Sequence, residues 1–255
     1  MRVRRNAVST VALWRAVDAA GKLQAARVVA VWNEKGDPGM AERMVDLTLT
    51  LTDNMPAHKL FQRPVIVPHY THAQTREQFF LGTEDDRLSF ATTYMGMIDH
   101  IGTHVDAFYH VNPEGLSVDR MPLDMFMGKA VCWDLTYIPD LGDIDVADFE
   151  EAEEKGGVKV DGHIVLLNTG LHNRHYPDVN RGSKMHGVEG PSTDKPSNNL
   201  FPNHRVCRDR GIAHYEWLIN LEELVGKGEF MFYGPPIKIG NGSGAPVRAW
   251  AILDD

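Results

Sequence analysis

The chain has 255 residues, of which 43% are hydrophobic and 24% are charged, and its formal net charge is −9. This length allows one large domain or two small ones with a sizeable core. The acidic balance argues against a sequence-independent nucleic-acid binder, and no apolar run reaches the ~18 residues of a membrane span.

The first 43 residues are expected to form an N-terminal helical arm. Met1–Arg5 is basic, but Arg15 and Asp18 interrupt the apolar core that a signal peptide requires. An amphipathic surface helix from Ser9 to Ala20 is therefore favoured. Cys132 and Cys207 stand alone without a CxxC pattern, which suggests either a reducing compartment or simply buried thiols. We expect a cytoplasmic protein.

Residues 44–255 are expected to form a single mixed α/β domain. Leucine and threonine alternate strictly along Val45–Thr52, which predicts a strand with one buried and one polar face. Pro64–Pro68 and Leu88–Met97 are predicted as further strands. The pattern then becomes α/β, with no internal repeat. Predicted strands are Lys129–Thr136, His163–Asn168, Glu229–Tyr233 and Val247–Leu253; predicted helical segments are Val146–Lys155, Phe201–Arg210 and a turn in Trp217–Gly226; Leu171–Pro196 is predicted as an irregular loop.

The segment from His100 to His110 carries most of the chemistry. It holds three histidines and one aspartate, which are ligands that divalent transition metals prefer. A continuous helix would separate His104 from Asp106, and a continuous strand would place His100 ~20 Å from Asp106. The backbone must therefore bend, and Gly102 is the residue that permits a bend.

His100, His104 and Asp106 together would leave coordination positions open for water and substrate. Such a site makes hydroxide available near neutral pH, but the hydroxide needs a partner for its proton. His110 is the nearest candidate for this proton transfer.

The pattern His-x-Gly-Thr-His-x-Asp-x-x-x-His resembles the signature of the cyclase family of metal-dependent hydrolases, which includes bacterial kynurenine formamidase and isatin hydrolase. The resemblance covers about residue 44 to the C-terminus. It implies a central, mostly antiparallel or mixed sheet or barrel flanked by helices, of the swivelling β/β/α kind. It also implies a small-molecule substrate and a homodimer or higher homo-oligomer.

The resemblance further implies a role for each site residue. His100, His104 and Asp106 match the metal ligands, and His110 matches the catalytic histidine. His204 and Glu216 match a second-metal site that Asp106 would bridge, so one or two zinc or manganese ions per chain are expected. Ser192 lies in a segment that resembles the family's pocket, and Phe108 replaces a usual proline and could line that pocket.

These features predict a metal-dependent hydrolase of an amide, lactam or related acyl bond. Two alternatives stay open. One is a non-haem iron oxygenase that uses His104, Asp106 and His204, although His100 and His110 would then have no role. The other is a metal-binding protein that has lost turnover.

Overall fold

The computed structural model describes most of the chain, namely residues 12–17, 23–28, 42–79, 81–83, 86–140, 142–175, 189–190, 192–195, 198 and 200–254. By its internal contacts the chain divides into two compact units, Met1–Glu42 with Asp254–Asp255, and Arg43–Leu253. Each unit is described by itself.

The N-terminal unit contains an antiparallel hairpin of β1 (Ala12–Val17) and β2 (Leu23–Val28). The helix expected over Ser9–Ala20 is therefore wrong for residues 12–17, and the rest of that range lies outside the described residues. The two runs pair in register over their full length, and this non-local pairing overrides a helical pattern that local sequence alone suggests. The arm boundary at residue 43 stays a prediction.

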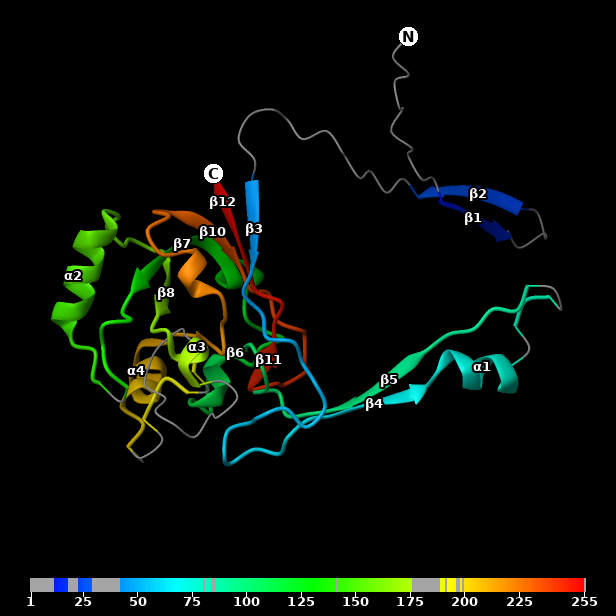
Figure 1. The fold of residues 1–255 in the computed structure, drawn as a ribbon, viewed down its shortest axis with the longest axis horizontal. Coiled ribbons are helices and arrows are strands. Elements are labelled where there is room, and N and C mark those ends of the chain that lie inside the picture. Colours follow the sequence, from blue (N-terminus) through cyan, green and yellow to red (C-terminus); the bar gives the residue numbers. More distant parts are fainter. Residues whose placement is uncertain are drawn as a thin grey trace, which may run out of the picture. The chain divides into compact units, whose positions relative to one another are not determined.

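The main sheet of the larger unit has five strands in the order β3-β12-β10-β7-β8 (Figure 1). β7 and β8 are parallel, whereas β10 is antiparallel to its neighbours β7 and β12. The predicted mixed α/β fold is confirmed by this arrangement. The strands are β3 (Glu42–Asp46), β7 (Met127–Asp134), β8 (Ile164–Asn168), β10 (Phe230–Tyr233) and β12 (Trp250–Asp254).

Both faces of the main sheet are covered, because successive side chains of a strand point to opposite faces. On β7, Ala130 and Cys132 join the larger core, which also contains Phe232. Val131 and Trp133 join a second core beneath the helix α2 (Val146–Gly156). Cores on both sides hold this sheet as a rigid base for the site.

A second, antiparallel sheet of three short strands has the order β11-β6-β9. Its strands are β6 (His104–Asp106), β9 (His214–Glu216) and β11 (Gly244–Pro246). Each strand has only three residues, too few for a period-2 pattern to be visible in the sequence. This small sheet carries four of the polar side chains of the candidate site.

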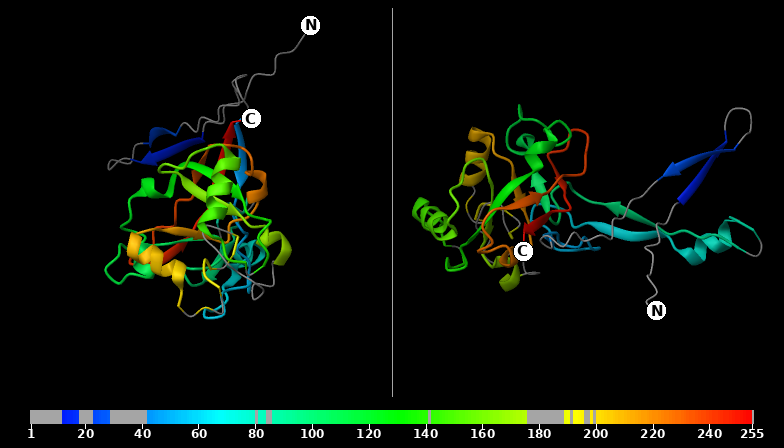
Figure 2. Two further views of the ribbon diagram at one scale, coloured as in Figure 1. Left: turned by 90° about the vertical axis from the view of Figure 1, so that its left-hand side faces the viewer. Right: turned by 90° about the horizontal axis from the view of Figure 1, so that it is seen from above.

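The strands β4 (Val65–Tyr70) and β5 (Thr92–Gly96) form an antiparallel hairpin that extends from the sheets of the larger unit (Figure 2). The helix α1 (His72–Gln78), which was not predicted, lies between the two strands and begins with a capping box at Thr71. Several large apolar side chains on this hairpin are exposed, among them those of Val67, Tyr94 and Met95.

The remaining helical segments mostly agree with the predictions. The predicted helix at Val146–Lys155 is α2, and Gly157 ends it in a left-handed conformation. The predicted loop begins instead with the short helix α3 (Leu171–His175), and most of residues 176–196 lie outside the described part of the chain. The other segments are α4 (Pro202–Arg210) and the 3₁₀ turns Phe108–His110, Leu123–Phe126 and Leu221–Glu223.

Candidate metal centre

The expected bend at Gly102 is present. Gly102 has a φ of +59°, a left-handed conformation that favours glycine, and β6 begins two residues later. Thr103 is buried, and its hydroxyl donates to the carbonyl of Trp217 and accepts from the backbone N–H of Leu49. The Gly-Thr pair of the motif therefore bends the chain and ties the bend to two neighbouring segments.

His104 is held with one ring nitrogen engaged and the other free. Its Nδ1 lies 2.8 Å from the carbonyl oxygen of Gly102, so Nδ1 carries the proton and Nε2 keeps its lone pair. Among the described residues, the buried Nε2 has no hydrogen-bond partner. It lies 3.3 Å from Oδ1 of Asp106 and 3.5 Å from Oε2 of Glu216. A buried nitrogen lone pair facing two carboxylates fits a metal cation between them.

His100 approaches Asp106 from the segment before the bend. Its Nδ1 lies 2.7 Å from Oδ1 of Asp106, and its Nε2 lies 2.8 Å from the hydroxyl of Ser243. That hydroxyl in turn donates to Oδ2 of Asp99 over 2.8 Å. Such outer partners fix the ring orientation of a metal-binding histidine, and no sequence pattern pointed to Ser243 or Asp99.

Asp106 lies at the centre of the cluster and is buried. Burial alone would raise the pKa of Asp106, but the charge of the neighbouring His214 and a hydrogen bond from His100 hold that pKa well below its ordinary value. The carboxylate is therefore ionised, and it faces the rings of all the predicted site histidines.

His110 follows β6 in the 3₁₀ turn Phe108–His110. Its Nε2 lies 3.5 Å from Oδ2 of Asp106, and its ring centroid lies 4.2 Å from that of His100. The side chain is 25% exposed. Burial lowers the pKa of His110, so the ring is neutral near pH 7 and can accept a proton.

His204 and Glu216 reach the same cluster from α4 and β9. Nε2 of His204 lies 3.8 Å from Oδ2 of Asp106, and its Nδ1 lies 2.6 Å from Oδ2 of Asp194. Asp194 also accepts the backbone N–H groups of Asn203 and His204 at the start of α4, so one carboxylate orients both helix and ring. Glu216 lies opposite His104 in the β6–β9 register.

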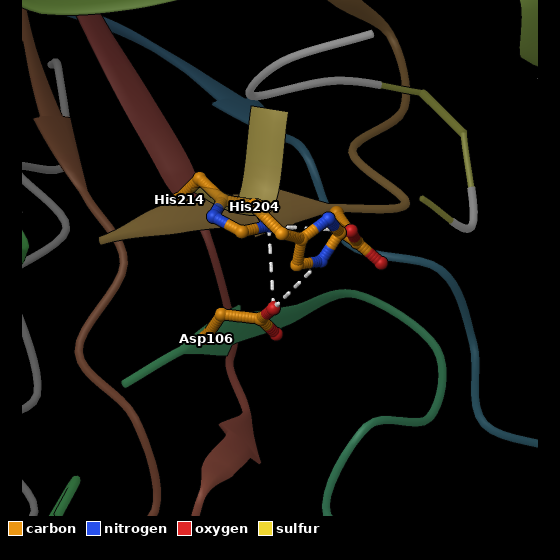
Figure 3. A group of neighbouring side chains, drawn as sticks. Asp106, His204 and His214 are labelled. Carbon is orange, nitrogen blue, oxygen red and sulfur yellow. Dashed lines mark hydrogen bonds and ion pairs between the residues drawn. The ribbon is translucent and has the colours of Figure 1, made fainter. Parts of the chain in front are cut away.

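The sequence did not predict that His214 would join these residues. Figure 3 shows its ring and that of His204 directed at Asp106. Asp106, His204, His214 and Glu216 each offer one ligand atom, and these atoms all lie within 4.8 Å of one another. Because β9 has only three residues, its sequence gives no periodic signal that could have placed His214 beside Glu216.

The cluster forms one wall of a cavity of about 440 Å³, a size typical of small-molecule sites. Ser192, which the sequence analysis expected in a pocket segment, is one of the residues that line this cavity. Phe108 is not among the residues that line it and instead packs, partly buried, against the larger core. Apolar residues make up much of the remaining lining, and two arginines join them: these residues include Leu60, Phe61, Val111, Phe201, Arg205 and Arg208.

Comparison with known proteins agrees with this geometry. Residues 45–208 match the family model Cyclase, described as "Putative cyclase". The kynurenine formamidase of Salinibacter ruber is 30% identical over 182 residues, which are 65% of this chain and 81% of that protein. The kynurenine formamidase of a Bacillus cereus strain is 25% identical over 166 residues, 59% of this chain and 74% of that protein.

A solved structure shows the same fold. Isatin hydrolase A from Labrenzia aggregata aligns with a TM-score of 0.70 and 22% identity, over 84% of this chain and 94% of that one. The fold and site define an α/β protein with a buried histidine–carboxylate centre suited to divalent metal. The chain belongs to the cyclase family. Among the described residues, no helix has the length and apolar character that crossing a bilayer requires.

Proposed function

We propose that the protein is a divalent-metal-dependent hydrolase of a carbon–nitrogen bond in an aryl formamide or a cyclic aryl amide. The unpartnered Nε2 of His104, buried between Asp106 and Glu216 at the cavity wall, is the observation that carries this proposal. The similarity to kynurenine formamidases supports the bond type. Zinc or manganese suits a set of imidazole and carboxylate ligands.

The proposed ligands are His100, His104 and Asp106 for one ion, with His204 and Glu216 holding a second ion that Asp106 bridges. A bound divalent ion supplies Lewis acidity that makes water a good nucleophile near neutral pH. The residues supply orientation. Gly102 and Ser243 hold the rings of His104 and His100, and Asp194 holds that of His204.

His110 is proposed to move the proton. The water oxygen adds to the carbonyl carbon, the carbon–nitrogen bond breaks, and the departing nitrogen takes one proton of the water, which yields a carboxylic acid and an amine. The acid then releases the second proton to solvent and becomes a carboxylate. The neutral His110 ring, partly open to the cavity, can accept the proton from water and pass it to that nitrogen.

The cavity favours a planar apolar substrate that ends in a negative charge. Leu60, Phe61 and Phe201 offer an apolar surface on which an aromatic ring can pack. Arg205 and Arg208 bring positive charge to the same cavity, which complements a carboxylate on the substrate or product.

Association with a second copy of the chain and a cytoplasmic location belong to the same proposal. The exposed Val67, Tyr94 and Met95 on the β4–β5 hairpin support association, because a two-stranded hairpin alone is marginally stable in water. The free, buried thiols of Cys132 and Cys207 support a reducing compartment. Light scattering of the wild type and of Tyr94→Lys measures the oligomeric state in solution, and the variant should shift toward the monomer.

The experiment that tests the activity is a hydrolysis screen of formanilides, isatins, lactones and cyclic imides. The protein is stripped with a chelator, assayed, and assayed again after zinc or manganese is restored, while melting temperature is recorded. We expect turnover only with metal and a lower melting temperature without it. Full activity in a preparation shown to be metal-free contradicts the proposal, and oxygen uptake in place of hydrolysis favours the iron oxygenase.

A further inference from the structure

His214 is placed in the site by strand register. β6 and β9 pair antiparallel, so that Asp106 lies directly opposite His214 and His104 lies opposite Glu216. Between them, Val105 and Tyr215 point to the other face and are buried in the core. The backbone therefore presents all four polar side chains on one face.

The distances around His214 are those of ligands that share an ion. Its Nε2 lies 3.2 Å from Oδ2 of Asp106 and 3.3 Å from Oε1 of Glu216. Tetrahedral bonds of ~2.0–2.1 Å place neighbouring ligand atoms ~3.3–3.4 Å apart. By contrast, the direct contact between His100 Nδ1 and Asp106 Oδ1 is 2.7 Å, the length of a hydrogen bond with an ionised partner.

The other ring nitrogen of His214 points away from the carboxylates. Its Nδ1 lies 3.6 Å from Sγ of Cys207, a weak hydrogen-bond acceptor. When an ion binds, a neutral ring that donates from Nδ1 would direct its Nε2 lone pair to the position between Asp106 and Glu216. Both carboxylates are buried, and a pair of buried negative charges also requires compensation.

We propose that His214 is a fourth protein ligand of the second ion, together with Asp106, His204 and Glu216. This inference rests on the metal centre of the proposed function and extends it. Two imidazoles and two carboxylates fill a tetrahedral site, so the second ion has no open position and serves to hold the cluster together. The first ion, beside His110, keeps the open position.

The cavity supports this division of roles. Asp106, His204 and Glu216 line the cavity, but His214 does not and lies on the buried side of the cluster. A ligand in that position would bind the second ion from the side away from the cavity, so it would not obstruct a substrate in the cavity. The second ion should therefore bind more tightly than the first.

The test replaces His214 with glutamine, which can still donate a hydrogen bond to a carboxylate but is a poor ligand for zinc. Metal content at saturating zinc and the Kd of each ion are measured by mass spectrometry and calorimetry. The wild type should hold two ions per chain. His214→Gln should hold the second at least about 100-fold more weakly, since even outer partners of ligands cost 10–100-fold.

His163→Gln is the matched control. His163 is also a largely buried histidine paired with a carboxylate, at 2.7 Å from Glu229, but it lies outside the cluster. It should bind both ions as the wild type does. If His214→Gln also binds both ions with unchanged Kd, His214 is no ligand, while the proposed two-metal function stands. If the wild type itself never exceeds one ion, the second site and the role of His214 both fail.

A measurement on the wild type covers the case in which His214→Gln does not fold. Anomalous diffraction from zinc-loaded crystals should place an ion ~2.0–2.2 Å from Nε2 of His214. An ion that is bound by His204 and Glu216 but lies more than about 3 Å from that nitrogen overturns the inference.

Discussion

His104 and Glu216 face each other across β6 and β9, with Nε2 of His104 3.5 Å from Oε2 of Glu216. Both side chains are buried. Burial alone would raise the pKa of Glu216, but a hydrogen bond with His214 holds that pKa below its ordinary value, so the residue is charged. The register therefore places the buried negative charge of Glu216 beside Nε2 of His104. A metal ion between them would neutralise the charge and bind the nitrogen.

Glu216→Gln should lose the second ion and keep the first. The substitution preserves size and removes the charge, and the proposed ligands of the first ion are unaltered. Metal analysis at saturating zinc should give one ion per chain instead of two. Glu189→Gln is the control, because Glu189 is equally buried but hydrogen-bonds Thr169 and Leu171 outside the cluster. An unchanged count of two in Glu216→Gln would make Glu216 a structural group.

Asp194→Asn should weaken metal binding without removing a ligand. The two backbone N–H groups at the start of α4 bond to different oxygens of Asp194, so asparagine can still accept one of them. It no longer places a negative charge 2.6 Å from Nδ1 of His204. Loss of such a partner typically costs 10–100-fold in metal affinity. The Kd of the second ion and the melting temperature of the stripped protein are measured together. An unaltered Kd with a lowered melting temperature would limit Asp194 to capping the helix.

The local part of the site could be predicted from the sequence. The spacing of His100, His104 and Asp106 excludes a continuous helix or strand, and Gly102 marks the place of the bend. The structure contains that bend and brings the three side chains together. All three residues lie within an eleven-residue segment, which has few conformations that bring them together. Elementary backbone geometry was therefore sufficient to predict the bend.

The non-local part could not be predicted. His214 meets Asp106 only because β9 pairs with β6, and strands of three residues give no periodic signal. The hairpin of β1 and β2 was missed for the same reason, since pairing partners decide the conformation of short apolar runs. The inward packing of Phe108 likewise depends on a core assembled from distant segments.

Gly102→Ala should destabilise the fold and the site together. A left-handed φ costs an L-residue about 1–2 kcal/mol, and a Cβ here would lie 2.5 Å from Cδ2 of Leu51, which adds about 1–3 kcal/mol of overpacking. Gly228→Ala is the matched control: its φ is +69°, and no atom of the described residues lies within 4 Å of the added Cβ.

Denaturant unfolding of the two glycine variants separates strain from packing. Gly228→Ala should lose only the backbone part, about 1–2 kcal/mol. Gly102→Ala should lose more and should also bind metal less tightly, because the Gly102 carbonyl holds Nδ1 of His104. Equal losses in the two variants, with metal affinity unaltered, would show that the bend does not position His104.

His110→Ala should keep the fold and the metal while losing kcat. Nε2 of His110 lies 3.5 Å from Asp106, and the ring lies partly open to the cavity, which suits proton transfer better than coordination. Loss of such a group typically lowers the rate by ~10²–10⁴-fold, with substrate binding largely intact. His104→Ala should instead lose metal, because it removes the unpartnered nitrogen. Metal content and steady-state kinetics of both variants are compared on the substrate that the screen identifies. A metal-free His110→Ala would make His110 a ligand, and normal turnover would place the proton transfer on another residue.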